Sequence, residues 1–265
     1  MTPETLDALA LGAAAGIGGL VIGSFLTVVV SRVPDSENLM RRSACPKCGE
    51  AIRARDNIPL VSWLLLRGRC RGCGERISAL YPAVELATAV LFVLAALYIR
   101  PLAVVPAYLY AAAIGVALTA IDARTRRLPD AIVYPSYPVL AVLLTLGSWA
   151  SGDWSALARG AIGALALLVG YGALVLVAPR GMGLGDAKLA GLVGLVLAYQ
   201  SWGVFAVGAL GAFLLGALWG IGVIVRTRGG RRTAIPFGPW MCAGAVVGLA
   251  VGAPLWAVYQ ELLGF

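Results

Sequence analysis

Long apolar runs, separated by short stretches that collect the charged residues, dominate this chain. Each of these runs except one is long enough to cross about 30 Å of hydrocarbon as a helix. The exception, Ala187–Tyr199, would reach only about 20 Å. We therefore expect an all-α polytopic membrane protein with about eight transmembrane helices, the sixth of them tilted or preceded by a glycine-rich stretch that dips into the membrane. The runs are Leu9–Val30, Tyr81–Ile99, Leu102–Ile121, Ala131–Trp149, Ala156–Val177, Ala187–Tyr199, Trp202–Val225 and Phe237–Val258.

Composition agrees with this pattern. The chain is 60% hydrophobic and 13% charged, with a mean hydropathy of +0.87, whereas a soluble domain of the same length is far more polar. The first residues, MTPETLDALALG, carry acids where a secretory signal carries basic residues. We expect the first run to be a spanning helix and no cleaved signal. The predicted domains are a first helix (1–30), a cytoplasmic loop domain (31–80) and a transmembrane domain (81–265).

The basic residues predict the topology. The net charge is +8, yet in a membrane protein such an excess indicates loops retained in the cytoplasm and not a nucleic-acid partner. All lysines and arginines except Arg100 and Arg159 lie on alternate loops, those after the first, third, fifth and seventh runs. Both termini are therefore expected outside. No internal repeat is apparent.

The loop after the first run holds two Cys-x-x-Cys pairs, CPKC and CRGC. Each pair can present two thiolates from one tight turn, and two pairs complete a tetrahedral zinc site without an open position for catalysis. Two disulfides are the alternative, but a cytoplasmic loop stays reduced. The sequence predicts a structural zinc ion on Cys45, Cys48, Cys70 and Cys73. A fifth cysteine, Cys242, is expected to be a small core residue.

Carboxylates provide the candidate chemistry, because the chain has no histidine. Its absence excludes serine triads, cysteine–histidine dyads and histidine metal ligands. Glu85, Asp122 and Asp186 lie in or against the apolar runs on the predicted cytoplasmic side, and Asp130 is close by in a loop. Acids at such depth are usually functional.

Asp122 and Asp186 are expected at the same depth and can form a dyad that shares one proton. The ionised member would take a proton from water and the protonated member would donate to a peptide carbonyl, which is aspartic-protease chemistry. Three alternatives remain open from the residues alone. Asp186 could be no more than a helix cap. Asp122 could be no more than the ion-pair partner of a nearby arginine. The two could also form a proton or ion pathway.

Glycines surround the second aspartate in the stretch GMGLGD, Gly181–Asp186. Glycine permits positive φ and close backbone approach. We expect Gly183 and Gly185 to keep this stretch from forming a regular helix and to let an extended substrate strand lie beside the carboxylate.

Several motifs follow one another along the chain. They are GSFLTVVVSRVP from Gly23, NIPLVSWLLLRGRC from Asn57 between the cysteine pairs, YPAVELATA from Tyr81, IDARTRRLPD from Ile121, GMGLGDAKL from Gly181 and IPFGPW from Ile235. Taken together, these motifs resemble the bacterial type IV prepilin peptidases, which are GxGD membrane aspartyl proteases. The resemblance extends over nearly the whole chain, with the motifs in the same order and with Thr27 where the family usually has asparagine.

The resemblance implies an aspartic endopeptidase of the inner membrane, with Asp122 and Asp186 as the catalytic pair facing the cytoplasm and Asp130 as a supporting residue. Its substrates would be prepilins or pseudopilins, cut after a glycine before an apolar helix, and pilus or secretion assembly proteins could be partners. Many such enzymes also N-methylate the new terminus with S-adenosylmethionine. A peptidase without that activity, a preflagellin-type peptidase, a proton-coupled transporter and a zinc-loop scaffold are the rival functions.

Overall fold

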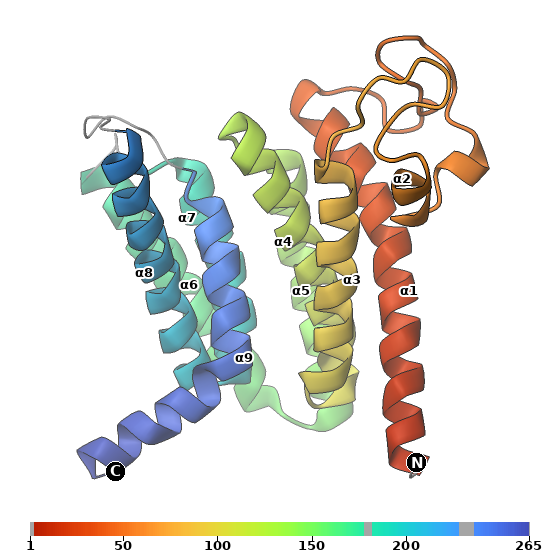
Figure 1. Cartoon of the computed structure of the whole chain (residues 1–265). Helices are drawn as coiled ribbons and strands as arrows, with labels where there is room; N and C mark the ends of the chain where they lie inside the picture. Colours follow the sequence, from red (N-terminus) through yellow and green to blue (C-terminus); the bar gives the residue numbers. More distant parts are fainter. Residues whose placement is uncertain (1–2, 178–181, 228–235, 265) are drawn as a thin grey trace. The chain divides into compact units, whose positions relative to one another are not determined.

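The computed structural model describes residues 3–177, 182–227 and 236–264, which form α-helices, short 3-10 helices, loops and two isolated β-bridges (Figure 1). The chain divides into two compact units, residues 1–120 and 121–265. The division lies within α4 (Val105–Thr125), so the last turn of that helix belongs to the second unit.

The first unit is built on two long helices that lie side by side (Figure 1). Small residues let α1 and α3 approach closely, as in other membrane helix pairs. A Cβ placed on Gly19 would lie 2.6 Å from Ala89 Cα, and one on Gly23 would lie 2.7 Å from Glu85 Cα. The elements of this unit before α4 are α1 (Pro3–Arg32), η1 (Val33–Asp35), η2 (Ala54–Asp56), α2 (Val61–Leu65), α3 (Leu80–Tyr98) and η3 (Leu102–Val104).

The loop between α1 and α3 contains the four cysteines and is fastened to the end of α1. The guanidinium of Arg32, in the last turn of α1, is buried and donates hydrogen bonds to the backbone carbonyls of Asn38, Leu39 and Arg41. Since each carbonyl belongs to the segment that leaves the helix, these bonds fix the direction in which the loop begins.

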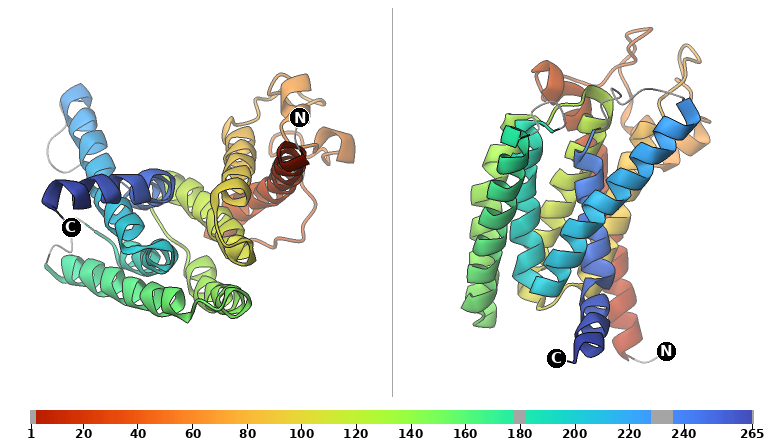
Figure 2. Two further views of the ribbon diagram at one scale, coloured as in Figure 1. Left: turned by 90° about the horizontal axis from the view of Figure 1, so that it is seen from below. Right: turned by 90° about the vertical axis from the view of Figure 1, so that its left-hand side faces the viewer.

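The second unit consists of the last turn of α4 and five further helices. The pairs α6–α7 and α8–α9 have the most extensive contacts, and Figure 2 shows α8 inclined to α7 and α9. Glycines again lie at the contacts, where a Cβ on Gly194 would lie 2.3 Å from the carbonyl oxygen of Gly163. The five helices are α5 (Asp130–Ser151), α6 (Trp154–Val177), α7 (Leu184–Gln200), α8 (Trp202–Thr227) and α9 (Gly238–Leu263).

Seven helical segments of the described residues are long and apolar enough to span a membrane. They correspond to seven of the eight apolar runs, and the remaining run forms α7, which is the short sixth segment. With 17 residues, α7 is three residues longer at its start than the run that predicted it. The physical reason is the local capping at Gly183, described below. The prediction of an all-helical polytopic membrane protein is confirmed.

Candidate active site and four-cysteine cluster

Asp122 lies in the last turn of α4, and its carboxylate is buried at the beginning of another helix. Its Oδ2 atom accepts a hydrogen bond of 3.1 Å from the backbone N–H of Gly238. Gly238 is the first residue of α9, follows the N-cap residue Phe237 and precedes Pro239. A helix N-terminus offers unpaired N–H groups and a positive dipole end, so it favours a carboxylate at this place.

Asp186 lies in the first turn of α7 and is half-buried. Its Oδ2 atom accepts a 3.0 Å hydrogen bond from the backbone N–H of Gly183, the N-cap residue. Its own backbone N–H donates to the Gly183 carbonyl at 3.1 Å. Asp186 therefore does cap a helix, as one of the alternatives expected. The capping bond uses only Oδ2 and not the second carboxylate oxygen.

The two aspartates are brought to the same end of the second unit. Asp122 and Asp186 lie close enough to interact electrostatically. Leu128, in the turn between α4 and α5, packs against the glycines of both motifs: a Cβ on Gly185 would lie 3.1 Å from Leu128 Cβ, and one on Gly238 would lie 3.5 Å from Leu128 Cδ2. Leu128 thus lies between the helix starts that hold the two carboxylates.

Asp130 takes part in a separate contact. As the first residue of α5, it accepts a 2.8 Å bond from Lys188 Nζ, and the Lys188 ammonium also lies 4.6 Å from the centre of the Tyr134 ring. The Tyr137 hydroxyl donates to the Lys188 carbonyl at 2.7 Å. These contacts join the beginnings of α5 and α7, the helix that carries Asp186.

An aromatic cluster packs against the start of α9. Tyr171 of α6, Phe213 of α8 and Phe237 lie with ring centres 5.3–6.1 Å apart. Tyr171 is buried and is within electrostatic range of Asp186. Because Phe237 immediately precedes Gly238, the cluster holds the residue whose N–H reaches Asp122. Tyr171, Leu128 and Gly238 were not predicted individually, although the IDARTRRLPD motif contains Leu128 and the IPFGPW motif contains Gly238.

The expectation for the glycine stretch is partly wrong. Gly183 is extended, with φ −90° and ψ 156°, but the helix begins at Leu184, so Gly185 is already helical. Neither glycine is among those with positive φ, and the close approach at Gly185 is to Leu128 of the same chain. The Asp186–Gly183 capping bond starts the helix earlier than the pattern suggested. Gly181 lies outside the described residues.

The four cysteines of the first loop converge. Cys45, Cys48, Cys70 and Cys73 have all their sulfur atoms within 4.8 Å of one another, a group that could hold a metal ion. The Sγ–Sγ distances are 3.8 Å for Cys45–Cys73 and 4.0 Å for Cys48–Cys70. Four thiolates about 2.3 Å from a zinc ion would be about 3.8 Å apart, so the donor set and its spacing fit zinc. All five cysteines lie in the described residues, and none of them forms a disulfide.

Two equivalent turns present these thiols. In the first, Cys45 N–H donates to the Glu50 carbonyl at 2.9 Å, and in the second, Cys70 N–H donates to the Glu75 carbonyl at 2.8 Å. Gly49 and Gly74 have φ of 73° and 71°, which glycine adopts without strain. The sequence signal is a repeated Cys-x-x-Cys-Gly-Glu at residues 45–50 and 70–75; the expectation of no internal repeat was wrong.

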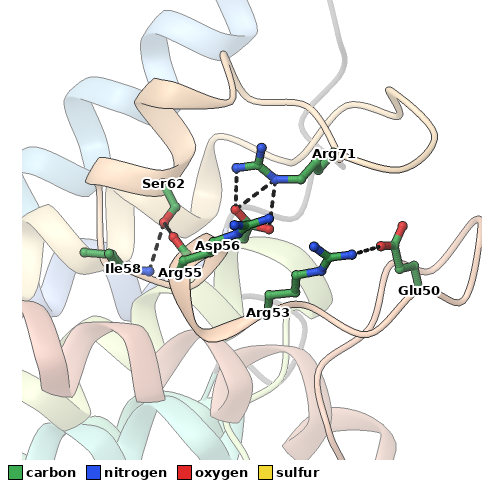
Figure 3. Close-up of polar contacts among 7 residues, drawn as sticks. All are labelled: Glu50, Arg53, Arg55, Asp56, Ile58, Ser62 and Arg71. Atoms are coloured by element: carbon green, nitrogen blue, oxygen red, sulfur yellow. Dashed lines mark hydrogen bonds and ion pairs between the residues drawn. The ribbon is translucent and has the colours of Figure 1, made fainter.

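Backbone donors and ion pairs stabilise the two turns. The N–H groups of Cys48 and Lys47 lower the pKa of the Cys45 thiol to about 7, which favours its thiolate. Burial and the neighbouring thiols instead raise the pKa of Cys48 and Cys73. Lys47 of the first turn forms an ion pair with Glu75 of the second. Arg71 binds Asp56 of η2 through two nitrogens at 2.7–3.1 Å (Figure 3).

Glu85, the third predicted carboxylate, belongs to the first unit and serves a different purpose. It is buried in the second turn of α3. Its Oε2 atom accepts a 2.8 Å hydrogen bond from the backbone N–H of Leu60, which directly precedes α2. The contact ties the residue before α2 to α3, which is a structural role within the first unit.

Comparison with known proteins places both units in one family. Residues 17–99 match the model of the bacterial peptidase A24 N-terminal domain, and residues 109–225 match that of the type IV leader peptidase family. A protein of Aeromonas salmonicida (strain A449), named prepilin leader peptidase/N-methyltransferase, is 38% identical over 88% of each chain. Proteins of the same name from Pseudomonas putida and Pseudomonas aeruginosa are each 34% identical, covering 93% of this chain and 93% and 92% of theirs. No solved structure matches the chain significantly.

Proposed function

Because the chain belongs to the type IV leader peptidase family, we propose that it is a membrane aspartic endopeptidase that removes the leader peptides of prepilins or pseudopilins. The observation that carries this proposal is the arrangement of Asp122 and Asp186. Each carboxylate accepts one backbone N–H at a helix N-terminus, and the two interact electrostatically at one end of the second unit.

Hydrolysis by this pair follows from the sharing of one proton. The ionised aspartate accepts a proton as water attacks the scissile carbonyl, and the protonated aspartate donates to the carbonyl oxygen. The proton held by the first aspartate then goes to the leaving amine as the tetrahedral intermediate collapses. Gly238 and Gly183 keep both carboxylates oriented through this exchange, since each binds one oxygen and leaves the other for water or substrate.

We propose that the substrate strand lies beside the exposed, extended backbone at Gly183. A backbone without a side chain leaves room for a peptide next to Asp186. Gly185 contributes indirectly, because its contact with Leu128 sets the position of the first turn of α7. The apolar helix that follows the cut would remain in lipid while its short leader reaches the aspartates from the cytoplasm.

The cysteine cluster is proposed to hold a structural zinc ion. Its four thiols fill a tetrahedral coordination sphere, so the ion would support folding of the loop and would leave no position for substrate. The positions of the basic loops support an inner-membrane protein with this loop and the aspartates in the cytoplasm.

Methylation of the new N-terminus, with S-adenosylmethionine as methyl donor, is proposed from the likeness to the relatives, whose names include N-methyltransferase. The four-cysteine loop lies within the part of the chain that matches the N-terminal domain model.

Intact-mass spectrometry of a prepilin reconstituted with the protein in liposomes tests both activities. Loss of the leader mass is expected without any cofactor. A further gain of one methyl group is expected only when S-adenosylmethionine is added. An unchanged substrate mass would contradict the peptidase proposal, whereas cleavage without the methyl gain would restrict the chain to the peptidase activity.

A further inference from the structure

The short helix α2 carries an apolar face that the other described residues of the first unit leave exposed. Val61, Leu64 and Leu65 are 48%, 66% and 78% exposed. Their spacing of i, i+3 and i+4 places them on one side of the helix. Three large aliphatic side chains exposed together on one short element indicate an interaction surface.

The opposite side of α2 is held firmly. Ser62 is buried, accepts a 2.9 Å bond from the Ile58 N–H and donates one of 2.9 Å to the Arg55 carbonyl (Figure 3). Trp63 donates its indole N–H to the Ile77 carbonyl at 3.3 Å, and its ring lies against Gly68. Because these bonds hold the inner side of α2 in place, the side chains of Leu64 and Leu65 on its other side are exposed.

A buried carboxylate sets the depth of α2. Leu60, the residue before α2, is bound to Glu85, which is five residues beyond the start of the spanning helix α3 and so about 7.5 Å along its axis. Figure 1 accordingly shows α2 at the level of the first turns of α3. Leu60 has φ 59° and ψ −48°, a conformation that is costly for a residue with a Cβ and persists only where other contacts impose it.

The flanking residues fit the boundary between lipid and water. Tyr81, in the first turn of α3, is 42% exposed, and exposed tyrosines are common at the headgroup level. Arg67 and Arg69 follow α2 directly and are exposed, where they can reach lipid phosphates. An apolar face at interfacial depth, bordered by cations, has the chemistry of an element that lies in the membrane surface.

We propose that α2 is an interfacial anchor: Val61, Leu64 and Leu65 enter the headgroup and acyl boundary of the bilayer, and Glu85 holds the helix at that depth. The partner is the lipid surface itself. The anchor gives the four-cysteine loop a contact with the membrane in addition to α1 and α3, and so restricts the orientation of this loop above the bilayer.

Quenching of an added tryptophan by lipids with brominated acyl chains tests the anchor. The full chain is reconstituted in phosphatidylglycerol and phosphatidylcholine liposomes, with brominated or ordinary chains, and the emission added by Leu65→Trp is compared. Ile52→Trp is the matched control, because Ile52 is an exposed aliphatic residue of the same loop that lies beside the first cysteine turn.

We expect brominated lipid to lower the emission added by Leu65→Trp roughly twofold, since interfacial helices bury their apolar faces about 5–10 Å into this boundary. The emission added by Ile52→Trp should not change. Adding Glu85→Ala to Leu65→Trp should reduce the quenching, because the bond that sets the depth is lost. Equal quenching at positions 52 and 65, or none at 65, would overturn the proposal, as would quenching at 65 that is unaffected by Glu85→Ala in a folded protein.

Discussion

At the scale of single residues, two backbone N–H groups orient the carboxylates of Asp122 and Asp186. Gly238 and Gly183 each donate to one carboxylate oxygen. A backbone donor cannot rotate away as a side chain can, so each carboxylate has one oxygen fixed in place. The other oxygen is left to water or substrate, which is the arrangement that proton exchange with a peptide requires.

Gly238→Ala should therefore reduce leader cleavage strongly. The new Cβ would lie 2.8 Å from Asp122 Oδ2, so the carboxylate must shift, and misplacement of a catalytic group by about 1 Å can cost about 10²-fold in rate. Initial rates of prepilin cleavage in liposomes measure the effect. Gly170→Ala is the control, because a Cβ there meets nothing within 4 Å. Equal rates for the two variants would mean that Gly238 does not position Asp122.

At the scale of elements, the helix ends carry most of the specific contacts. Arg159 of α6 illustrates this at the end of α7. It donates hydrogen bonds to the carbonyls of Ala198, Tyr199 and Gln200, which are the carbonyls that a helix leaves unpaired at its C-terminus. The predicted topology places Arg159 on the outer side, where basic residues are scarce, and this capping role explains its presence there.

Arg159→Ala should destabilise the protein by roughly 2 kcal/mol, because hydrogen bonds from a charged donor are each worth about 1.5–3 kcal/mol and part of this is regained from water. Thermal unfolding in detergent measures the change. Arg100→Ala is the comparison, since Arg100 binds carbonyls of Ala96 and Ile99 next to it in the chain. A midpoint for Arg159→Ala that is no lower than that of Arg100→Ala would refute the capping role.

The apolar runs predicted the long helices well, because hydrocarbon burial alone determines them. Short elements escaped the prediction: α2 has five residues, too few for a periodic pattern, and depends on the distant Glu85. At the site, Asp122 and Asp186 were recognisable because acids near lipid are costly. Gly238 was not recognisable, because it contributes a backbone N–H, which every residue except proline has. Leu128 was not recognisable because the chain has many apolar residues like it.

At the scale of the whole molecule, the two units carry different chemistry. The first holds the four-cysteine cluster, and the second holds both aspartates. Metal binding and peptide cleavage should therefore be separable, because the four cysteines and the two aspartates share no residue.

Cys70→Ser, or treatment with a zinc chelator, should loosen the first loop much more than it slows cleavage. Loss of one of four ligands removes the folding energy that the metal supplies. Hydrogen exchange over residues 45–75 and bound-zinc content measure the loop, and Cys242→Ser, outside the cluster, is the control. Complete loss of cleavage while the loop stays protected from exchange would instead place the metal in catalysis.

Cleavage should have a bell-shaped dependence on pH. At low pH both aspartates are protonated and no base remains, and at high pH both are ionised and no acid remains. Rates with one prepilin, measured in liposomes that remain intact across the range, test this. A flat profile between about pH 4 and 9 would count against a pair that shares one proton.

The central claim is that Asp122 and Asp186 perform the cleavage, and the most direct measurement is the rate of leader removal by Asp122→Asn and Asp186→Asn in liposomes. Asparagine keeps an oxygen that can accept the N–H of Gly238 or Gly183, so the helix cap is retained. It has no carboxyl group to take up or release a proton. Asp153→Asn, the same change at a residue that binds the Ala156 N–H at the start of α6, is the control.

Both dyad variants should lose at least about 10²-fold in rate with unchanged thermal unfolding, and the control should cleave normally. Cleavage at the normal rate by either folded dyad variant would contradict the account.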